Sequence, residues 1–390
     1  TVDERQILVG LYTRLDRKEK ALEVEMELAS IFFEKGDLDE SATICAKIIS
    51  EDPKHIRAHQ KLLEIHTRTG QKDKAKEESR ALAEVLAQDN QLDSAIEMLQ
   101  NLVKANPGDL SARSNLCEML ERSGFTGRAL SEYLSLGAEC EKHGDLDGAI
   151  ETYRKAVSLD HASVDAHLLL GKILLEKKQD FPAGVRELQT VCELHPNHTD
   201  ALSLLWFGYV SLGSAIPALE TGAMLRRLDA GSAALFSKAK EDLEQVVRKD
   251  TSNIQALYKL ALVYRVSGDL ELAIRILQSA AKKVPENVVK LYGLAGHCFV
   301  ESARMKKERG GKEGDSDWES DLFAAKAQFQ KALQYKGKRP DEDFLELHYF
   351  FGNYHEAMGQ KNEALAQYQE ALMIDPDHRY SKEKSATIEV

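Results

Sequence analysis

The clearest pattern of apolar and polar positions lies in residues 254–285 and predicts two helices joined by a tight turn. Apolar residues recur there at helical spacing in two runs: Leu257, Leu260, Ala261 and Tyr264, then Leu272, Ile276, Leu277 and Ala280. Between the runs, Gly268 suits the left-handed end of a first helix and Asp269 the start of a second. Pro285 ends the second helix, and Ala273 is small enough for two antiparallel helices to approach closely.

A longer pattern organises the N-terminal part of the chain. Three helical segments end at Pro53, Pro107 and His161, and these positions are 54 residues apart. Such a unit has room for three helices, one more than a helix pair. The middle helix of each unit is apolar on two faces, which predicts burial between two neighbours. Residues 197–251 also hold three helices, whereas residues 162–196 hold a pair with one extra residue near Gln179.

Local signals mark the helix boundaries. First helices are expected to end at Gly70, Gly124, Gly144, Gly213 and Gly359. Asp37 and Glu40 have the spacing of a capping box, which would start a helix there. A polar, glycine-rich insertion at 304–318 interrupts the pattern; its first part can extend the preceding helix, and the rest is expected to be a mobile turn. Residues from 377 onward form either a capping helix or a frayed tail.

These helix pairs resemble the tetratricopeptide repeat, a helix-turn-helix unit of about 34 residues. In the first stretch, the family's signature positions fall on Leu257, Leu260, Ala261, Tyr264, Ala273, Leu277, Ala280 and Pro285. Near the C-terminus they fall on Phe351, Gly352, Gly359, Ala364, Tyr368, Ala371 and Pro376. Because a single repeat cannot bury its apolar face, the resemblance implies that neighbouring copies stack into a solenoid.

The expected fold is therefore all-α, a right-handed superhelical solenoid of antiparallel helix pairs with about 20 helices. We divide the chain into three parts by repeat period. Residues 1–161 carry the 54-residue three-helix units, residues 162–285 carry central repeats, and residues 286–390 carry C-terminal repeats with the polar insertion and a capping tail.

Charge and cysteine usage narrow the classes of function. The chain has 64 acidic and 52 basic residues, a formal net charge of −12, which argues against a nucleic-acid-binding protein because that class needs a basic face. Five cysteines at apolar helical positions suggest small buried side chains in a reducing compartment. They are Cys45, Cys117, Cys140, Cys192 and Cys298. The sequence contains no apolar run long enough to span a bilayer, so no direct membrane insertion is expected.

No catalytic or metal-binding motif outweighs a structural explanation of the same residues. Residues 309–314 are glycine-rich and basic, but they lack the spacing of a phosphate-binding loop and its Ser or Thr. His55 and His59 are four apart and could share a helix face, yet the repeat frame places no third ligand near them. We expect no cofactor, no metal and no enzyme activity within these residues.

The resemblance implies a concave groove, lined by the first helix of each pair, that holds a peptide or helix of a partner protein. Carried onto this chain, the groove residues are Ser203, Phe207, Gln255, Tyr258, Leu262, Arg265, Tyr292, Phe299, Glu346, Tyr349 and Asn353. Contiguous apolar groups are unfavourable in water, so we expect a partner segment to cover them. The alternative is that single side chains pack against the adjacent helix. Tyr349 replaces the Lys of the family's carboxylate clamp, which favours an apolar or helical ligand.

The predicted function is a non-enzymatic scaffold or adaptor that binds protein or peptide partners within a multiprotein assembly, in the cytoplasm. Two alternatives stay open: a regulatory or targeting arm of a larger enzyme whose catalytic domain lies outside these residues, and a structural protein that self-associates. Because the first residue is Thr1, a periplasmic or membrane-anchored location through a missing N-terminal segment also stays open.

Overall fold

The computed structural model describes residues 2–228, 231–283, 287–309 and 316–389. These ranges form 21 α-helices, one short π-helix and one short 3-10 helix, without a β-strand. The all-α repeat fold predicted from the sequence is thereby confirmed. Pro285 and residues 310–315 of the polar insertion lie outside the described residues. Within the described ranges, no helix combines the length and the apolar character needed to cross a membrane.

The chain divides into two compact units, Thr1–Leu170 and Gly171–Val390, which we call unit 1 and unit 2. The boundary falls inside helix α10 (Val164–Ile173). The three-part division by repeat period stays a prediction.

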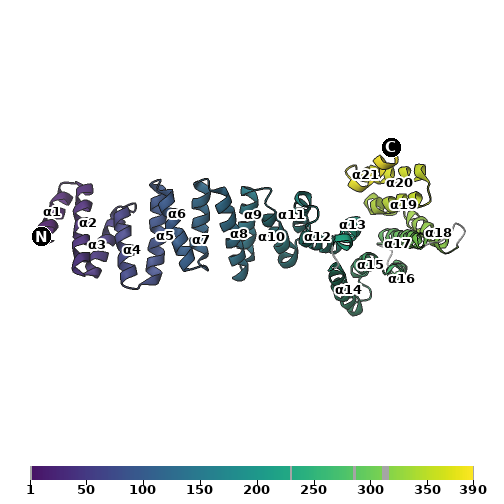
Figure 1. Ribbon diagram of the computed structural model, residues 1–390, viewed down its shortest axis with the longest axis horizontal. Helices are drawn as coiled ribbons and strands as arrows, with labels where there is room; N and C mark the ends of the chain where they lie inside the picture. Colours follow the sequence, from purple (N-terminus) through teal and green to yellow (C-terminus); the bar gives the residue numbers. More distant parts are fainter. Residues whose placement is uncertain (1, 229–230, 284–286, 310–315, 390) are drawn as a thin grey trace. The chain divides into compact units, whose positions relative to one another are not determined.

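Unit 1 contains helices that follow one another side by side in chain order (Figure 1). They are α1 (Val2–Arg14), α2 (Lys18–Lys35), α3 (Leu38–Glu51), α4 (Ile56–Arg68), α5 (Lys72–Gln88), α6 (Leu92–Ala105), α7 (Leu110–Arg122), α8 (Thr126–Lys142), α9 (Leu146–Leu159) and α10 (Val164–Ile173). Helices α2, α5 and α8 begin at Lys18, Lys72 and Thr126, which confirms the 54-residue period, and the helices after them keep the same offset. Each of these three helices packs against both of its neighbours.

A polar tie recurs in unit 1 with the same offset. A basic residue in the first turns of α4, α7 and α10 hydrogen-bonds the carbonyl oxygen of the residue six positions earlier. The three pairs are His59 with Pro53 at 3.0 Å, Arg113 with Pro107 at 3.3 Å and His167 with His161 at 3.1 Å. The first two also pair with an acid of the following helix, Glu78 and Glu132 respectively. The first two ties therefore join a turn to the helix that follows it and to the next helix along the chain.

Helix ends follow the sequence signals closely, with one exception. The glycines predicted to end helices all have left-handed backbones, as does Gly268: φ is 69° at Gly70, 73° at Gly124 and Gly213, 78° at Gly144, 71° at Gly359 and 92° at Gly268. The capping box at Asp37 is wrong, because its side chain makes no capping hydrogen bond. Backbone bonding starts α3 instead, with the Ser41 N–H donating to the Asp37 carbonyl at 3.1 Å.

Unit 2 begins in α10 and continues through more varied elements. They are η1 (Leu174–Lys178), α11 (Phe181–Leu194), α12 (Thr199–Leu212), α13 (Ala215–Leu228), α14 (Ser232–Lys249), α15 (Ile254–Ser267), α16 (Leu270–Lys283), α17 (Val288–Glu308), α18 (Ser316–Leu333), η2 (Asp341–Phe344), α19 (Leu345–Ala357), α20 (Lys361–Ile374) and α21 (Arg379–Glu389). One cluster of buried apolar residues extends from Ala215 to Tyr368. It forms most of the core of this unit from α15 onward.

Several features of unit 2 agree with the sequence patterns. The extra residue near Gln179 is accommodated by the π-helix η1, after which Gln179 itself takes a left-handed backbone with φ of 56°. Residues 197–251 hold the three helices α12, α13 and α14. The first part of the insertion extends α17 as far as Glu308, and the C-terminal residues form the helix α21 rather than a frayed tail.

Candidate functional site

The eleven predicted groove residues all belong to α12, α15, α17 and α19, which we call the first-helix surface of unit 2. The structure places them at three levels of exposure. Phe207 and Gln255 are exposed; Ser203, Arg265, Tyr292, Phe299, Glu346 and Asn353 are partly buried; Tyr258, Leu262 and Tyr349 are buried. Contacts within unit 2 therefore already cover much of the predicted surface.

Glu346 is the centre of these internal contacts. Its Oε1 accepts a hydrogen bond from the Ala215 N–H at 2.9 Å, and its Oε2 accepts one from the Tyr258 hydroxyl at 3.1 Å. Ala215 is the first residue of α13, where free N–H groups and the helix dipole favour a negative charge. The carboxylate thus joins α19 to segments 131 and 88 residues earlier in the chain.

Burial controls the protonation of this cluster. It raises the pKa of Glu346 above its usual 4.5, while the Ala215 N–H, the Lys290 charge and the Tyr258 hydroxyl act in the opposite direction. Burial, followed by the Glu346 charge, raises the pKa of Tyr258 well above 10. Tyr258 therefore keeps its proton at neutral pH and can donate it in the hydrogen bond to Glu346.

The next contacts connect α19 and α13 with the C-terminal helix α21. The Tyr349 ring lies 6.1 Å from the ring of Tyr380, and burial, followed by the charge of Glu220 in α13, raises the pKa of both tyrosines. Asn353 accepts a hydrogen bond from the Tyr368 hydroxyl at 2.7 Å. Tyr349 and Asn353 are therefore part of the packing between helices of unit 2.

Arg265 of the predicted set is also engaged inside unit 2. It forms an ion pair with Glu301 of α17 at 3.0 Å, and both side chains are largely buried. The nearby His297 stacks on Phe350 with ring centroids 4.5 Å apart, and burial, together with the Arg265 charge, keeps its pKa well below 6.5. This part of the surface is tied between α15, α17 and α19.

The open part of the first-helix surface lies on α12 and at the start of α15. Phe207 is 41% exposed and makes an edge contact with Phe181, with ring centroids 6.2 Å apart. Gln255 lines a small hollow together with Leu212 and Lys290. Aromatic side chains that stand beside polar groups in this way are common anchors for protein partners.

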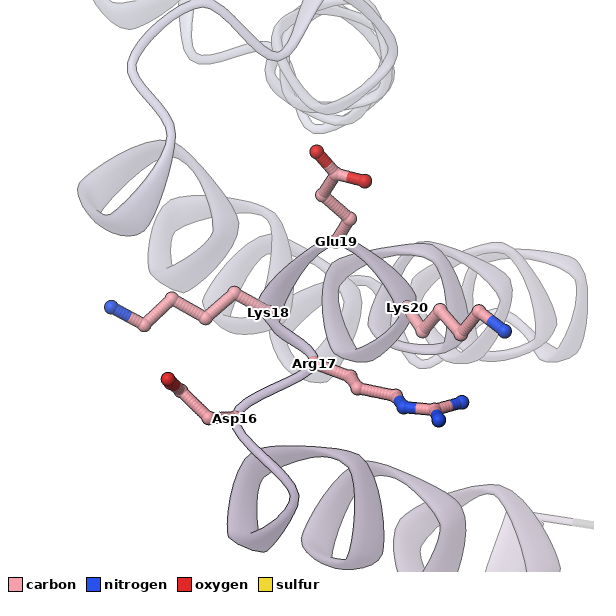
Figure 2. Close-up of a pocket in the computed structure, with 5 residues that line it drawn as sticks. All are labelled: Asp16, Arg17, Lys18, Glu19 and Lys20. Atoms are coloured by element: carbon pink, nitrogen blue, oxygen red, sulfur yellow. The ribbon is translucent and has the colours of Figure 1, made fainter.

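Other candidate positions do not assemble into a site. Residues 16–20, between α1 and α2, line a shallow hollow, but Figure 2 shows their five side chains pointing in different directions. His55 accepts a hydrogen bond from the Ala58 N–H, and His59 belongs to the polar tie of unit 1. In the described ranges, no three His, Cys, Asp or Glu side chains gather as metal ligands would.

The residues that complete the cluster around Glu346 were not predicted from the sequence. Ala215 contributes only a backbone N–H, and Glu220 influences Tyr349 and Tyr380 although the three residues lie far apart in the chain. Glu346 carried a signal, because it is the one carboxylate in the run from Leu345 to Phe351. A lone charge in such a run indicates a specific buried partner.

Comparisons with known proteins identify the family. A family model described as TPR repeat matches residues 139–178, and two described as Tetratricopeptide repeat match residues 228–288 and 345–378. The chain contains tetratricopeptide repeats in these three segments. Proteins of this family generally use the repeat as a non-catalytic protein-interaction fold, so this repeat protein belongs to the class of interaction scaffolds.

A curated relative and several solved structures resemble this tetratricopeptide-repeat protein. The E3 ubiquitin-protein ligase CHIP of Arabidopsis thaliana is 35% identical over 108 residues, which is 25% of this chain and 38% of that protein. The TPR domain of P58(IPK) is 16% identical with a TM-score of 0.30, covering 94% of this chain and 97% of that one. A repeat protein from Parabacteroides merdae is 15% identical with a TM-score of 0.31, covering 81% and 99%.

Proposed function

We propose that the chain is a non-enzymatic scaffold that binds a segment of a partner protein, as a peptide or a helix, on the first-helix surface of unit 2. The observation that supports this proposal is the exposed Phe207 on α12, in edge contact with Phe181. It stands at a position that faces the ligand in the family. Leaving a large aromatic side chain in water is unfavourable, and a partner side chain packed against it would remove that cost.

The internal contacts indicate which part of the surface is available. Tyr258, Glu346 and Tyr349 already have partners within unit 2, so a ligand would have to displace those contacts to reach them. Phe207 and Gln255 need no such displacement. We therefore place the ligand across α12 and the start of α15, where polar neighbours such as Ser203 can select its orientation.

Site-specific photocrosslinking tests this placement. The photoreactive residue p-benzoylphenylalanine replaces Phe207 in the full chain expressed in its own cells, and adducts are identified after irradiation. Phe323 on α18, which is 77% exposed and lies outside the first-helix surface, is the matched control position. An adduct that forms from position 207 and not from 323 would support the proposal. Equal adducts from both positions, or none from 207, would reject it.

A second function is favoured by the likeness to the Arabidopsis ubiquitin ligase. The chain would then be the interaction arm of a larger enzyme, because it spans only 38% of that relative. Mass spectrometry of the protein isolated from its own cells separates the two functions. Peptides of a catalytic domain in the same polypeptide would support the enzyme arm, and a polypeptide without one would support the independent scaffold.

A further inference from the structure

Unit 1 contains a hollow that the scaffold function proposed for unit 2 does not use. It lies between α4, α5 and α6 and has a volume of about 430 Å³. Leu63 and Leu102 form apolar walls, Ser79 lies in α5, and His66, Thr67 and Lys76 add polar groups. All of these residues belong to unit 1, so the hollow is complete within one compact unit.

The 54-residue period explains why this space exists. Ser79 stands where the next unit has Tyr133, and Leu63 and Thr67 stand where it has Cys117 and Glu121. Tyr133 is 2% exposed, and its hydroxyl donates to Glu121 at 2.9 Å. Ser79 has no ring, and its hydroxyl turns back to the Ala75 carbonyl at 2.8 Å. The Tyr133 ring fills the space beside α7, and no ring fills the equivalent space beside α4.

The preceding unit fills the same position in another way. Glu25, one period before Ser79, is 5% exposed and pairs with Lys47. Two of the three equivalent positions thus carry a long buried side chain with a polar partner, and only Ser79 leaves the place open.

A side chain at the hollow, His66, also carries a polar atom without a partner. The Nδ1 atom of His66 is buried and has no hydrogen-bond partner among the described residues. Burial, and then the charge of Lys74, lowers the pKa of His66, so the imidazole is neutral at physiological pH. A neutral ring nitrogen can accept a hydrogen bond, and a buried one without a partner is unfavourable.

We propose that this hollow binds a tyrosine side chain of a partner protein, which fills from outside the place that Tyr133 fills from inside. The ring would lie against Leu63 and Leu102, and the phenol hydroxyl would donate to His66 Nδ1 once the imidazole turns this atom toward the hollow. The proposal extends the scaffold function to unit 1 and adds a residue-level specificity. A phenylalanine would fill the space but leave His66 without its hydrogen bond, so tyrosine is preferred.

The test uses p-cresol, the side-chain analogue of tyrosine, and toluene, the analogue of phenylalanine, with the full chain. NMR of labelled Leu methyl groups and His66 follows binding. We expect saturable shifts at Leu63, Leu102 and His66, with p-cresol binding about threefold to tenfold more tightly than toluene because of one added hydrogen bond. Because the probe needs no partner, the result is independent of crosslinking at Phe207.

Three variants decide the outcome. Ser79→Tyr supplies the missing ring and should abolish binding, whereas Ser131→Tyr, at an exposed position of α8, should leave it unchanged. His66→Leu copies Leu120 of the next unit and should remove the preference for p-cresol over toluene, which keeps the test decisive if Ser79→Tyr does not fold. Absence of saturable shifts, equal binding by a folded Ser79→Tyr, or an unchanged preference in His66→Leu would overturn the proposal.

Discussion

Units 1 and 2 are built from the same kind of helix pair but are held together over different distances. In unit 1 the polar ties are local: Arg113 bonds a carbonyl six residues earlier and an acid 19 residues later. In unit 2, Glu346 bonds groups 88 and 131 residues earlier. Arrays with only nearest-neighbour contacts lose structure locally, whereas a long-range tie couples distant elements. The loss of structure caused by a destabilising substitution should therefore remain local in unit 1 and extend to distant helices in unit 2.

The largest effect is expected from filling the close helix contacts with a side chain. Added Cβ atoms at Gly137 of α8 and Gly352 of α19 would lie 2.3 Å from the rings of Tyr153 and Tyr368, both fully buried. Gly137→Leu and Gly352→Leu should each cost about 3 kcal/mol or more of unfolding free energy. Hydrogen exchange should quicken only around α7–α9 in the first variant, but also in α13 and α15 in the second.

The control for this pair is Gly10→Leu, in the middle of α1. A Cβ there meets nothing within 4 Å, and replacing a mid-helix glycine favours the helix by up to about 1 kcal/mol. Gly10→Leu should therefore leave the unfolding free energy unchanged or raise it. An equal spread of faster exchange in both close-contact variants would contradict the contrast between the units.

The second effect comes from the long-range tie itself. Glu346→Ala leaves the Ala215 N–H and the Tyr258 hydroxyl without acceptors and should cost about 1–3 kcal/mol, measured by urea unfolding at pH 7. Glu342→Ala, at an exposed position of η2, should change little. If the two variants are equally stable, Glu346 does not couple α19 to the earlier helices.

Glu346 also predicts a dependence of stability on pH. Burial raises its folded-state pKa above 4.5, so the folded state binds this proton more tightly than the unfolded state does. The additional stability that comes from this bound proton is therefore fully present below about pH 4.5 and is lost as the pH rises through the folded-state pKa, whereas the hydrogen bonds accepted from Ala215 and Tyr258 remain. The unfolding free energy, measured from pH 4.5 upward, should fall less steeply for Glu346→Gln, which cannot titrate, than for the parent chain.

These contrasts also show which features of the fold and of the candidate site could be predicted from the sequence. Turns at glycines, the three-helix spacing and the extra residue at Gln179 depend on neighbouring residues, so local pattern was enough to predict them. The Glu346 contacts depend on how many repeats pack between α13 and α19, which no local pattern specifies. The hollow at Ser79 left a readable signal, a serine aligned with Tyr133, but its meaning needs the packing around that ring.

A third effect concerns the polar tie of unit 1, which is formed by a histidine at one position and by an arginine one period later. The hydrogen bond to Glu78, and then that to the Pro53 carbonyl, raises the pKa of His59 above 6.5 against the effect of burial. The stability that protonated His59 contributes is present below about pH 6.5 and is lost as the pH rises through the raised folded-state pKa. We expect a loss on the order of 1 kcal/mol, measured by urea unfolding from pH 6 to 9.

Arg113 supplies the control for this prediction, since arginine holds the equivalent position and keeps its charge throughout. His59→Arg should flatten the pH dependence, and Arg113→His should increase it. The same slope in all three proteins would show that the tie does not titrate as proposed.

The smallest effect concerns α1, where the period continues but the packing does not. Leu8 is 40% exposed, whereas Leu62 and Leu116, one and two periods later, are 9% and 1% exposed. Leu62 packs against Cys45 and Ile48 of α3. Leu8→Ala should therefore cost less than about 1 kcal/mol, against about 2–5 kcal/mol for Leu116→Ala. Both losses can be measured by urea unfolding.

A large loss from Leu8→Ala would carry its own meaning. The cost of deleting a leucine side chain rises with the contacts it makes, so a loss as large as that of Leu116→Ala would mean that another surface covers α1 in solution. Repeating the measurement over a range of protein concentrations identifies that surface. A loss that grows with concentration indicates a second copy of the chain, because only a contact between molecules gains stability by mass action.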